Sequence, residues 1–341
     1  MFTDRRINSL PTKRERQHWP SDRTYNILSL AGGGIRGIFS AQFLKACEKE
    51  FGSTAIYKHF DCIAGTSTGG ITALGLSIGM STDEVVKFYK VDGRKIFPLL
   101  PSNSLSAARR FMRSWWKPKL DHQELENALK ARFGDRLLGE AFPRLIIPAF
   151  MMPKTEIAVF KTDHHRDFKN DHLTPMWKVA RSTAAAPTYL KGLEDQPSGK
   201  VFLDGGVWAN NPVMVAIVDA LSAYNLTFEQ IRVLSIGTGN HPLELNRKQI
   251  LGGLVAWKQA VEAAMFLTTD NATAQAKLLL GPQNCIRFEP DAECANISMD
   301  DYDNAFRLLP SAAESAFDLG KSQIKSFFES AVPDRERHYS S

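Results

Sequence analysis

Short apolar runs alternate with stretches in which apolar side chains recur at helical spacing. The runs Tyr25–Leu30 and Phe60–Ala64 predict buried strands, and the stretches Ile38–Phe51 and Gly70–Leu76 that follow them predict helices. This strand–helix–strand–helix order is typical of parallel sheets covered by helices. The sequence therefore predicts an α/β fold with three layers, α/β/α, and a largely parallel central sheet.

A serine stands between two glycines where the second predicted strand turns into its helix. Residues Gly65 to Gly69 read Gly-Thr-Ser-Thr-Gly, which fits the pattern G-x-S-x-G. Glycine permits a tight turn, and the helix start exposes the hydroxyl beside the positive end of the helix dipole. We therefore expect Ser67 to be a nucleophile, with a purely structural turn as the alternative.

A glycine-rich loop follows the first predicted strand. Gly32, Gly33 and Gly34 leave backbone N–H groups at a helix start, where such groups stabilise an oxyanion or bind a phosphate. The spacing of Gly32, Gly34 and Gly37 also fits G-x-G-x-x-G, the fingerprint of dinucleotide-binding proteins. That alternative requires a carboxylate about 20 residues further on, after the next strand. Asp61 lies inside that strand instead.

An aspartate ends a later apolar run and precedes a glycine turn. Val201–Asp204 predicts a strand, and Pro212 opens the helix predicted over Val213–Tyr224, because proline is favoured at the first helical position. Taken alone, Asp204 is a turn-capping residue. Together with Ser67 and the glycine loop, it supplies the base that a serine nucleophile needs.

These three motifs resemble, in order and spacing, the motifs of the patatin-like phospholipases. The segments concerned are Gly32 to Gly37, Gly65 to Gly70 and Asp204 to Pro212, and the resemblance extends from about Tyr25 to Gly239. It implies a phospholipase A type serine lipid acyl hydrolase that cleaves ester bonds of membrane phospholipids. It also implies a Ser-Asp dyad that works without histidine.

The resemblance assigns roles to individual residues. Ser67 is the expected nucleophile, Asp204 the general base, and Gly32, Gly33 and Gly34 the oxyanion hole. Free Asp has a pKa near ~3.9, so burial in an apolar site must raise the pKa of the base. Arg36 either contacts the lipid phosphate, fixes the glycine loop, or is a surface cation at a helix start.

The motif set further resembles that of the stand-alone bacterial members of the family, some of which are anti-phage effectors switched on by cyclic nucleotides. This resemblance implies a cyclic dinucleotide as activator, no other cofactor and no metal. It also implies a gated enzyme, with a homo-oligomer as one way to gate it. The expected partners are membrane phospholipids and the membrane surface, and no nucleic acid polymer.

Two further alternatives concern the chemistry. A hydrolase with a Ser-Asp-His triad would place its histidine after the aspartate, and His241 follows a predicted strand end at Gly239. A catalytically idle lipid or nucleotide sensor would keep the fold for binding alone. The intact motifs at Ser67 and Asp204 argue against the sensor.

Positive charge is concentrated in one segment rather than spread over the chain, whose formal net charge is +5. Between Lys87 and Leu120, cations outnumber anions and alternate with aromatic and aliphatic side chains. Arg109, Arg110 and Arg113 belong to this segment. Such a mixture favours binding to an anionic membrane surface. The alternative is a solvated insertion whose aromatic side chains pack inward.

The expected location is the cytoplasm, peripheral at the inner membrane when the enzyme is active. No run approaches the ~18 apolar residues of a membrane span, and the first residues contain no apolar signal-peptide core. Four cysteines, including Cys47 and Cys62 at apolar positions, indicate free thiols.

The three motifs must converge on one site, which predicts one domain over residues 25–341 after a flexible basic arm, 1–24. Apolar side chains recur at helical spacing from about Leu243 onward, so 243–341 is a mainly helical part that completes the core, forms a lid or regulates. Asp163 to His172 contains three histidines but lacks the spacing of structural metal sites. We expect that segment to be an exposed polar loop.

Overall fold

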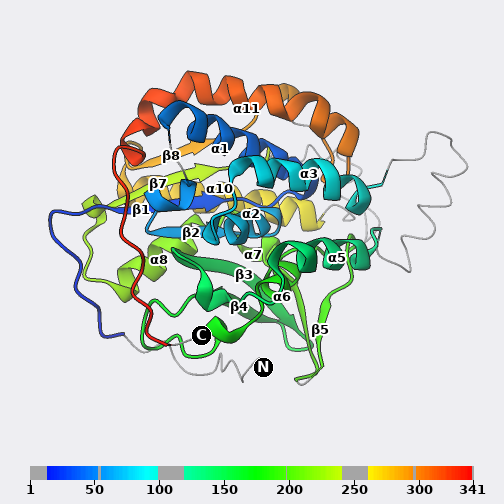
Figure 1. Ribbon diagram of the computed structural model, residues 1–341, viewed down its shortest axis with the longest axis horizontal. Helices are drawn as coiled ribbons and strands as arrows, with labels where there is room; N and C mark the ends of the chain where they lie inside the picture. Colours follow the sequence, from blue (N-terminus) through cyan, green and yellow to red (C-terminus); the bar gives the residue numbers. More distant parts are fainter. Residues whose placement is uncertain are drawn as a thin grey trace, which may run out of the picture.

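The computed structural model describes residues 14–52, 55–98, 119–196, 198–239, 260–294 and 297–339. Its strands are β1 (Tyr25–Leu30), β2 (Cys62–Gly65), β3 (Arg144–Met152), β4 (Glu156–Lys161), β5 (Leu193–Asp195), β6 (Lys200–Asp204), β7 (Ile231–Ile236) and β8 (Cys285–Phe288). They form one sheet in the order β5-β6-β3-β2-β1-β7-β8, with β4 paired to β3 (Figure 1). The strands from β8 through β7, β1 and β2 to β3 are parallel, which confirms the predicted sheet.

The described helices of eight residues or more are α1 (Ile38–Phe51), α2 (Thr68–Ser77), α3 (Thr82–Ile96), α5 (His122–Phe133), α6 (Met176–Thr183), α8 (Val213–Ala223), α10 (Ala260–Leu280) and α11 (Tyr302–Ile324). A short helix, α7 (Gly206–Ala209), follows β6 directly. The first predicted helix matches α1 in full, and the helix predicted after the serine begins two residues earlier than expected.

Alternate residues of the strands pack into two separate cores, because side chains of a strand point to opposite faces of the sheet. Leu28 and Leu30 of β1 pack with side chains of α1, α3 and α11. Tyr25 and Ile27 pack with side chains of α8 and α10 on the opposite face. Figure 1 shows α1, α3 and α11 together on one side of the strands. The three-layer α/β/α architecture is therefore confirmed.

The pairing of β3 determines where the two candidate catalytic residues meet. β2 pairs with the start of β3 at Arg144 to Ile146, and β6 pairs antiparallel with its end at Ala149 to Met152. β4 pairs with Ile146 to Met151 and so occupies the other edge of β3. β2 and β6 therefore share one edge and point toward each other. Their carboxyl ends, which lead to Ser67 and Asp204, converge near the middle of β3.

The arm predicted to be flexible is packed where the structure describes it, from residue 14 onward. Trp19 is buried against Tyr25 and Tyr224, with ring centroids 4.8 and 5.2 Å away. The backbone of Gln17 donates to the carbonyl of Ala223 at 2.8 Å. These contacts hold Trp19 and Gln17 against the fold, and the flexibility of the arm as a whole stays a prediction.

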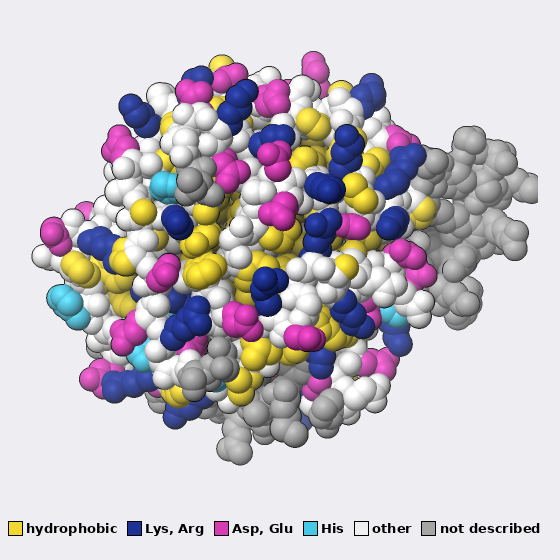
Figure 2. Space-filling model, viewed as in Figure 1, with side chains coloured by type: hydrophobic (Ala, Val, Ile, Leu, Met, Phe, Trp, Pro, Cys, Tyr) yellow, Lys and Arg dark blue, Asp and Glu magenta, His cyan; other side chains and the backbone are white. Residues whose placement is uncertain are grey.

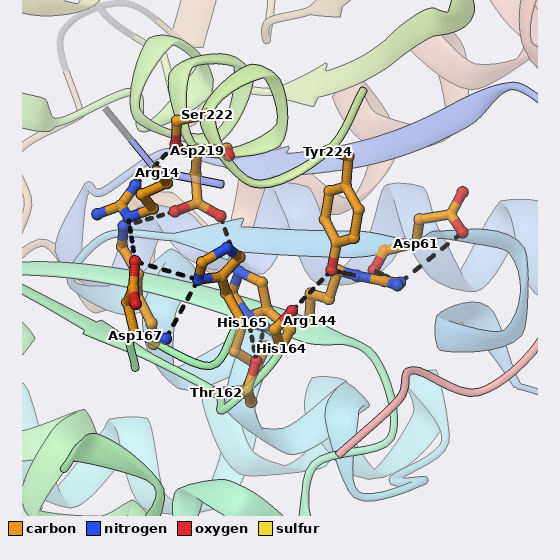
Figure 3. Close-up of polar contacts among 12 residues, drawn as sticks. Arg14, Asp61, Arg144, Thr162, His164, His165, Asp167, Asp219, Ser222 and Tyr224 are labelled. Carbon is orange, nitrogen blue, oxygen red and sulfur yellow. Dashed lines mark hydrogen bonds and ion pairs between the residues drawn. The ribbon is translucent and has the colours of Figure 1, made fainter. Parts of the chain in front are cut away.

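The histidine-rich segment is partly buried: Asp163, His164, His165 and His172 are buried, whereas Arg166, Asp167 and Lys169 are exposed. The prediction of an exposed polar loop is therefore wrong for the four buried residues. His164 lies between Thr162 and Asp219, 2.8 Å from an oxygen of each (Figure 3). Burial lowers the pKa of His164 to about 4, against the attraction of Asp219. Lys161 also bonds to Asp219, at 2.5 Å. Hydrogen bonds and an ion pair thus satisfy the buried polar groups of Lys161, His164 and Asp219. In the described part of the chain, no group of three or more His, Cys, Asp or Glu side chains could bind a metal ion.

The described C-terminal helices pack against the rest of the fold. α11 contacts α1 along its length, and α10 lies against α7 and α8. A role of 243–341 as a lid or regulatory part stays a prediction. None of the helices in the described ranges is both long and apolar enough to span a bilayer.

Candidate active site

Ser67 lies on a sharp turn between β2 and α2. Its backbone has a φ of +55°, a strained region for a residue with a side chain. Glycines on either side make this turn sterically feasible. A Cβ on Gly65 would lie 2.3 Å from the carbonyl oxygen of Gly69, and one on Gly69 would lie 2.3 Å from that of Leu30. The predicted strand–serine–helix turn is confirmed.

Thr183, at the end of α6, supports this turn. The N–H of Ser67 donates to the Thr183 hydroxyl at 2.9 Å, and that hydroxyl donates to the carbonyl of Pro148 at 2.6 Å. The turn at Ser67 is therefore tied to β3 as well as to β2. Sequence reasoning missed this role, because it depends on Ser67, 116 positions away, and on Pro148, 35 positions away, and no local pattern signals either contact.

Asp204 is buried beside Ser67 at the end of β6, with 2% of its surface exposed. Burial raises the pKa of its carboxyl to about 7, while hydrogen bonding with Ser67 and with the N–H of Gly206 acts in the opposite direction. The Gly206 bond reaches Oδ1 at 2.7 Å. Oδ2 is buried and has no well-aligned hydrogen-bond partner among the described residues. The required rise in pKa thus has a physical cause in the structure.

The glycine loop offers N–H groups next to Ser67, although not the complete set predicted. The prediction that Gly32 is an oxyanion donor is wrong, because the N–H of Gly32 donates to the carbonyl of Asn210 at 3.0 Å. The N–H groups of Gly33 and Gly34 have no acceptor within the described ranges. The N–H of Thr68, the residue after the candidate nucleophile, also has no acceptor within the described ranges, and the G-x-S-x-G pattern could have indicated this group.

Arg36 fixes the glycine loop, one of the three roles considered for it. Its guanidinium donates to the carbonyl of Gly33 at 3.3 Å and to that of Gly239 at 2.6 Å. These bonds link the glycine loop to the segment after β7. The dinucleotide alternative is less compatible with this loop, because the carbonyl of Met299 covers it and accepts from the N–H of Ile35 at 3.0 Å.

An apolar pocket opens beside the two candidate catalytic residues. Its empty space measures about 650 Å³, including space open to solvent. Ser67 and Asp204 contribute polar groups at this pocket. The apolar lining comes from α3, α5, the segment after α6, α10 and the segment before α11, and it includes Phe88, Ile96, Leu125, Leu190, Met265 and Met299. A long hydrocarbon chain suits such a lining, whereas a charged cofactor does not.

Some predicted residues lie outside the described part of the chain. They are His241, the histidine of the triad alternative, and Arg109, Arg110 and Arg113 of the basic segment. All four cysteines are described. They are free, as the sequence indicated, and all are buried, as the sequence indicated for Cys47 and Cys62.

Comparison with known proteins identifies a family. The sequence profile described as Patatin-like phospholipase matches residues 28–217. A protein named cGAMP-activated phospholipase, from Pseudomonas aeruginosa (strain BWHPSA011 / Pa011), is 35% identical over 216 residues, which are 63% of this chain and 62% of that protein. Patatin-like protein 2 from Arabidopsis thaliana is 34% identical over 282 residues, covering 72% of this chain and 66% of that protein.

A further relative, also named cGAMP-activated phospholipase and from Escherichia coli (strain TW11681), is 28% identical over 270 residues. That match covers 74% of each protein. The chain spans less than two thirds of the length of the first two relatives, at 62% and 66%.

The raised pKa of Asp204 predicts a specific effect of Asp204→Asn on stability. A carboxyl whose pKa is higher in the folded state than in the unfolded state loses stabilisation as pH rises from about 4 to about 7. The Asn variant removes this penalty. Thermal unfolding should therefore show a higher Tm for Asp204→Asn than for the wild type at pH 8, with the difference shrinking toward pH 5. A penalty near 1.4 kcal/mol per pKa unit sets the upper limit. A lower Tm of the variant at every pH would contradict the raised pKa.

Proposed function

This chain belongs to the patatin-like phospholipase family, and we propose that it is a serine acyl hydrolase that cleaves ester bonds of membrane phospholipids, with Ser67 as nucleophile and Asp204 as general base. The main support is the position of these two residues. They come from strands that converge on the same edge of β3, and both line one apolar pocket.

The first half of the proposed reaction is acyl transfer to the serine. Asp204 takes the hydroxyl proton of Ser67 while the serine oxygen attacks the ester carbonyl carbon. Negative charge develops on the carbonyl oxygen, next to the N–H groups of Gly33, Gly34 and Thr68. One oxyanion donor is typically worth roughly 3 kcal/mol in the transition state. When the tetrahedral intermediate collapses, the bond to the lysophospholipid oxygen breaks and that oxygen takes the proton from Asp204.

The apolar pocket supports a lipid acyl chain as the part of the substrate that enters the protein. Charged head groups would stay outside, because the described lining contains no cation. Figure 2 shows cations and anions interspersed with hydrophobic side chains over one face of the molecule, so no single sign of charge dominates that face. Docking at the inner membrane through the basic segment, which includes Arg109, Arg110 and Arg113, remains part of the proposal.

Regulation by a cyclic dinucleotide is also part of the proposal. Three relatives bear the name cGAMP-activated phospholipase. A hydrolase of membrane lipids inside a cell would damage its host unless its activity were gated, and such gating suits an effector of anti-phage defence. The activator needs to favour the open state by roughly 5 kcal/mol to convert a mostly closed population into a mostly open one.

Ser67→Ala and Asp204→Ala should each abolish release of fatty acid from phospholipid vesicles, because the two residues act as one unit in acyl transfer. Circular dichroism should show that both variants are folded.

Substantial turnover by Asp204→Ala, together with loss of turnover in His241→Ala, would indicate a Ser-Asp-His triad instead. Absence of hydrolysis and of serine labelling in the wild type, with vesicles or soluble esters and with every nucleotide tested, would indicate an idle sensor.

The wild type should release almost no fatty acid from phospholipid vesicles alone, and adding the matching cyclic dinucleotide should activate it. Fatty acid release is measured with a panel of cyclic di- and trinucleotides, and linear dinucleotides of the same composition are the control. Full activity without any nucleotide, unchanged by the whole panel, would refute gating and leave the hydrolase proposal standing.

A further inference from the structure

Asn210 lies between α7 and α8 and holds a fixed orientation in the site. Its side chain is buried, with 3% of the residue exposed. Its Nδ2 donates to the hydroxyl oxygen of Thr269 on α10 at 3.0 Å. That hydroxyl donates its one hydrogen to the carbonyl of Met265 at 2.8 Å, so toward Asn210 it can only accept. The amide nitrogen of Asn210 must therefore face α10, and its oxygen must point the other way.

The amide oxygen of Asn210 points toward both candidate catalytic residues. A Cβ placed on Gly32 would lie 2.5 Å from this oxygen and 3.1 Å from Cβ of Ser67. A Cβ placed on Gly206 would lie 3.2 Å from the same oxygen and 3.1 Å from Oδ1 of Asp204. Asn210 Oδ1 therefore packs closely against Gly32 and Gly206, the glycines that lie next to the candidate nucleophile and the candidate base.

Two buried acceptors next to the candidate nucleophile have no well-aligned hydrogen-bond partner within the described ranges. They are Oδ1 of Asn210 and Oδ2 of Asp204. A buried acceptor without a donor typically costs about 1–3 kcal/mol, so each favours a polar molecule that can donate to it. Water has two hydrogens to donate and keeps its lone pairs for other contacts. One water molecule therefore carries enough hydrogens to donate to both oxygens.

We propose that Asn210, held by Thr269, positions the water that hydrolyses the acyl-Ser67 intermediate; this inference rests on the proposed function. One hydrogen of the water bonds to Oδ2 of Asp204 and the other to Oδ1 of Asn210, which leaves a lone pair of the water oxygen for the acyl carbonyl carbon. Asn210 is thus a positioning residue, since it contacts the attacking water and exchanges no proton.

The step balances as follows in atoms and protons. The water oxygen forms a bond to the acyl carbon, and Asp204 takes one water proton. The tetrahedral intermediate then collapses, the bond between the acyl carbon and the Ser67 oxygen breaks, and that oxygen takes the proton from Asp204. The products are a free carboxylic acid and the regenerated serine. The amide of Asn210 stays neutral throughout.

The test separates the two halves of the reaction with a soluble p-nitrophenyl ester, under conditions in which the wild type turns over. Release of p-nitrophenol reports acylation, and mass spectrometry of the peptide that contains Ser67 reports the acyl-enzyme. Asn210→Ala should retain a burst of about one equivalent of p-nitrophenol, accumulate the acyl-enzyme and deacylate on the order of 10²-fold more slowly, because a misplaced reactant costs about that factor.

Two variants at Thr269 provide a matched pair. Thr269→Val keeps the shape of the side chain but cannot accept from Nδ2 of Asn210, so it should also accumulate acyl-enzyme. Thr269→Ser retains the hydroxyl and should behave like the wild type. Asn211→Ala controls for a general loss of stability, since Asn211 bonds to Ser29 and Thr273. It should leave the ratio of acylation to deacylation unchanged.

Equal loss of acylation and deacylation in Asn210→Ala, without accumulation of acyl-enzyme, would overturn the inference and leave Asn210 with a structural role. Accumulation in Thr269→Ser to the same extent as in Thr269→Val would also overturn it. Failure of the proposed function gives a different result, because then no acyl group appears on Ser67 even in the wild type.

Discussion

Burial of one carboxyl without a cation is the constraint on which the proposed chemistry depends. Asp204 and Asp219 are both buried at 2% exposure, yet their pKa values shift in opposite directions. Burial raises both, but Lys161 and His164 overcome this effect at Asp219 and hold its pKa below the ordinary range. The causes of the shift at Asp204 include no charged neighbour. Its carboxyl is therefore basic enough to accept a proton near neutral pH, which a free Asp is not.

The sheet keeps this unfavourable arrangement in place. β2 and β6 approach each other along one edge of β3, and Thr183 ties the turn at Ser67 to Pro148 on the same strand. A strained serine and a buried carboxyl without a cation both cost stability, and such costs persist only where the surrounding structure enforces them. The two cores on either side of the sheet supply that support. Activity and stability are thus opposed at Asp204, where removal of the charge should stabilise the fold and stop the chemistry.

Much of this site could be predicted from local sequence, because its motifs stand directly at the ends of apolar runs. The turn at Ser67, the glycine loop and the parallel sheet all follow from patterns within a few residues. The exceptions depend on distant partners. Gly32 donates to Asn210 far along the chain, and His164 is buried with Asp219 as its hydrogen-bond partner. No local pattern reports either pairing, so sequence reasoning assigned an oxyanion role to the first and exposure to the second.

The most direct test of the account is the pH dependence of Ser67 labelling by a fluorophosphonate, compared between the wild type and Asp204→Asn. Labelling of the wild type should accelerate as pH rises, with a midpoint near the pKa of about 7. A free histidine titrates at a similar pH, so the variant decides the question. In Asp204→Asn, the account predicts slow labelling that shows no such midpoint. Equally fast labelling of Ser67 in the variant, with the same midpoint, would contradict the assignment of Asp204 as the base.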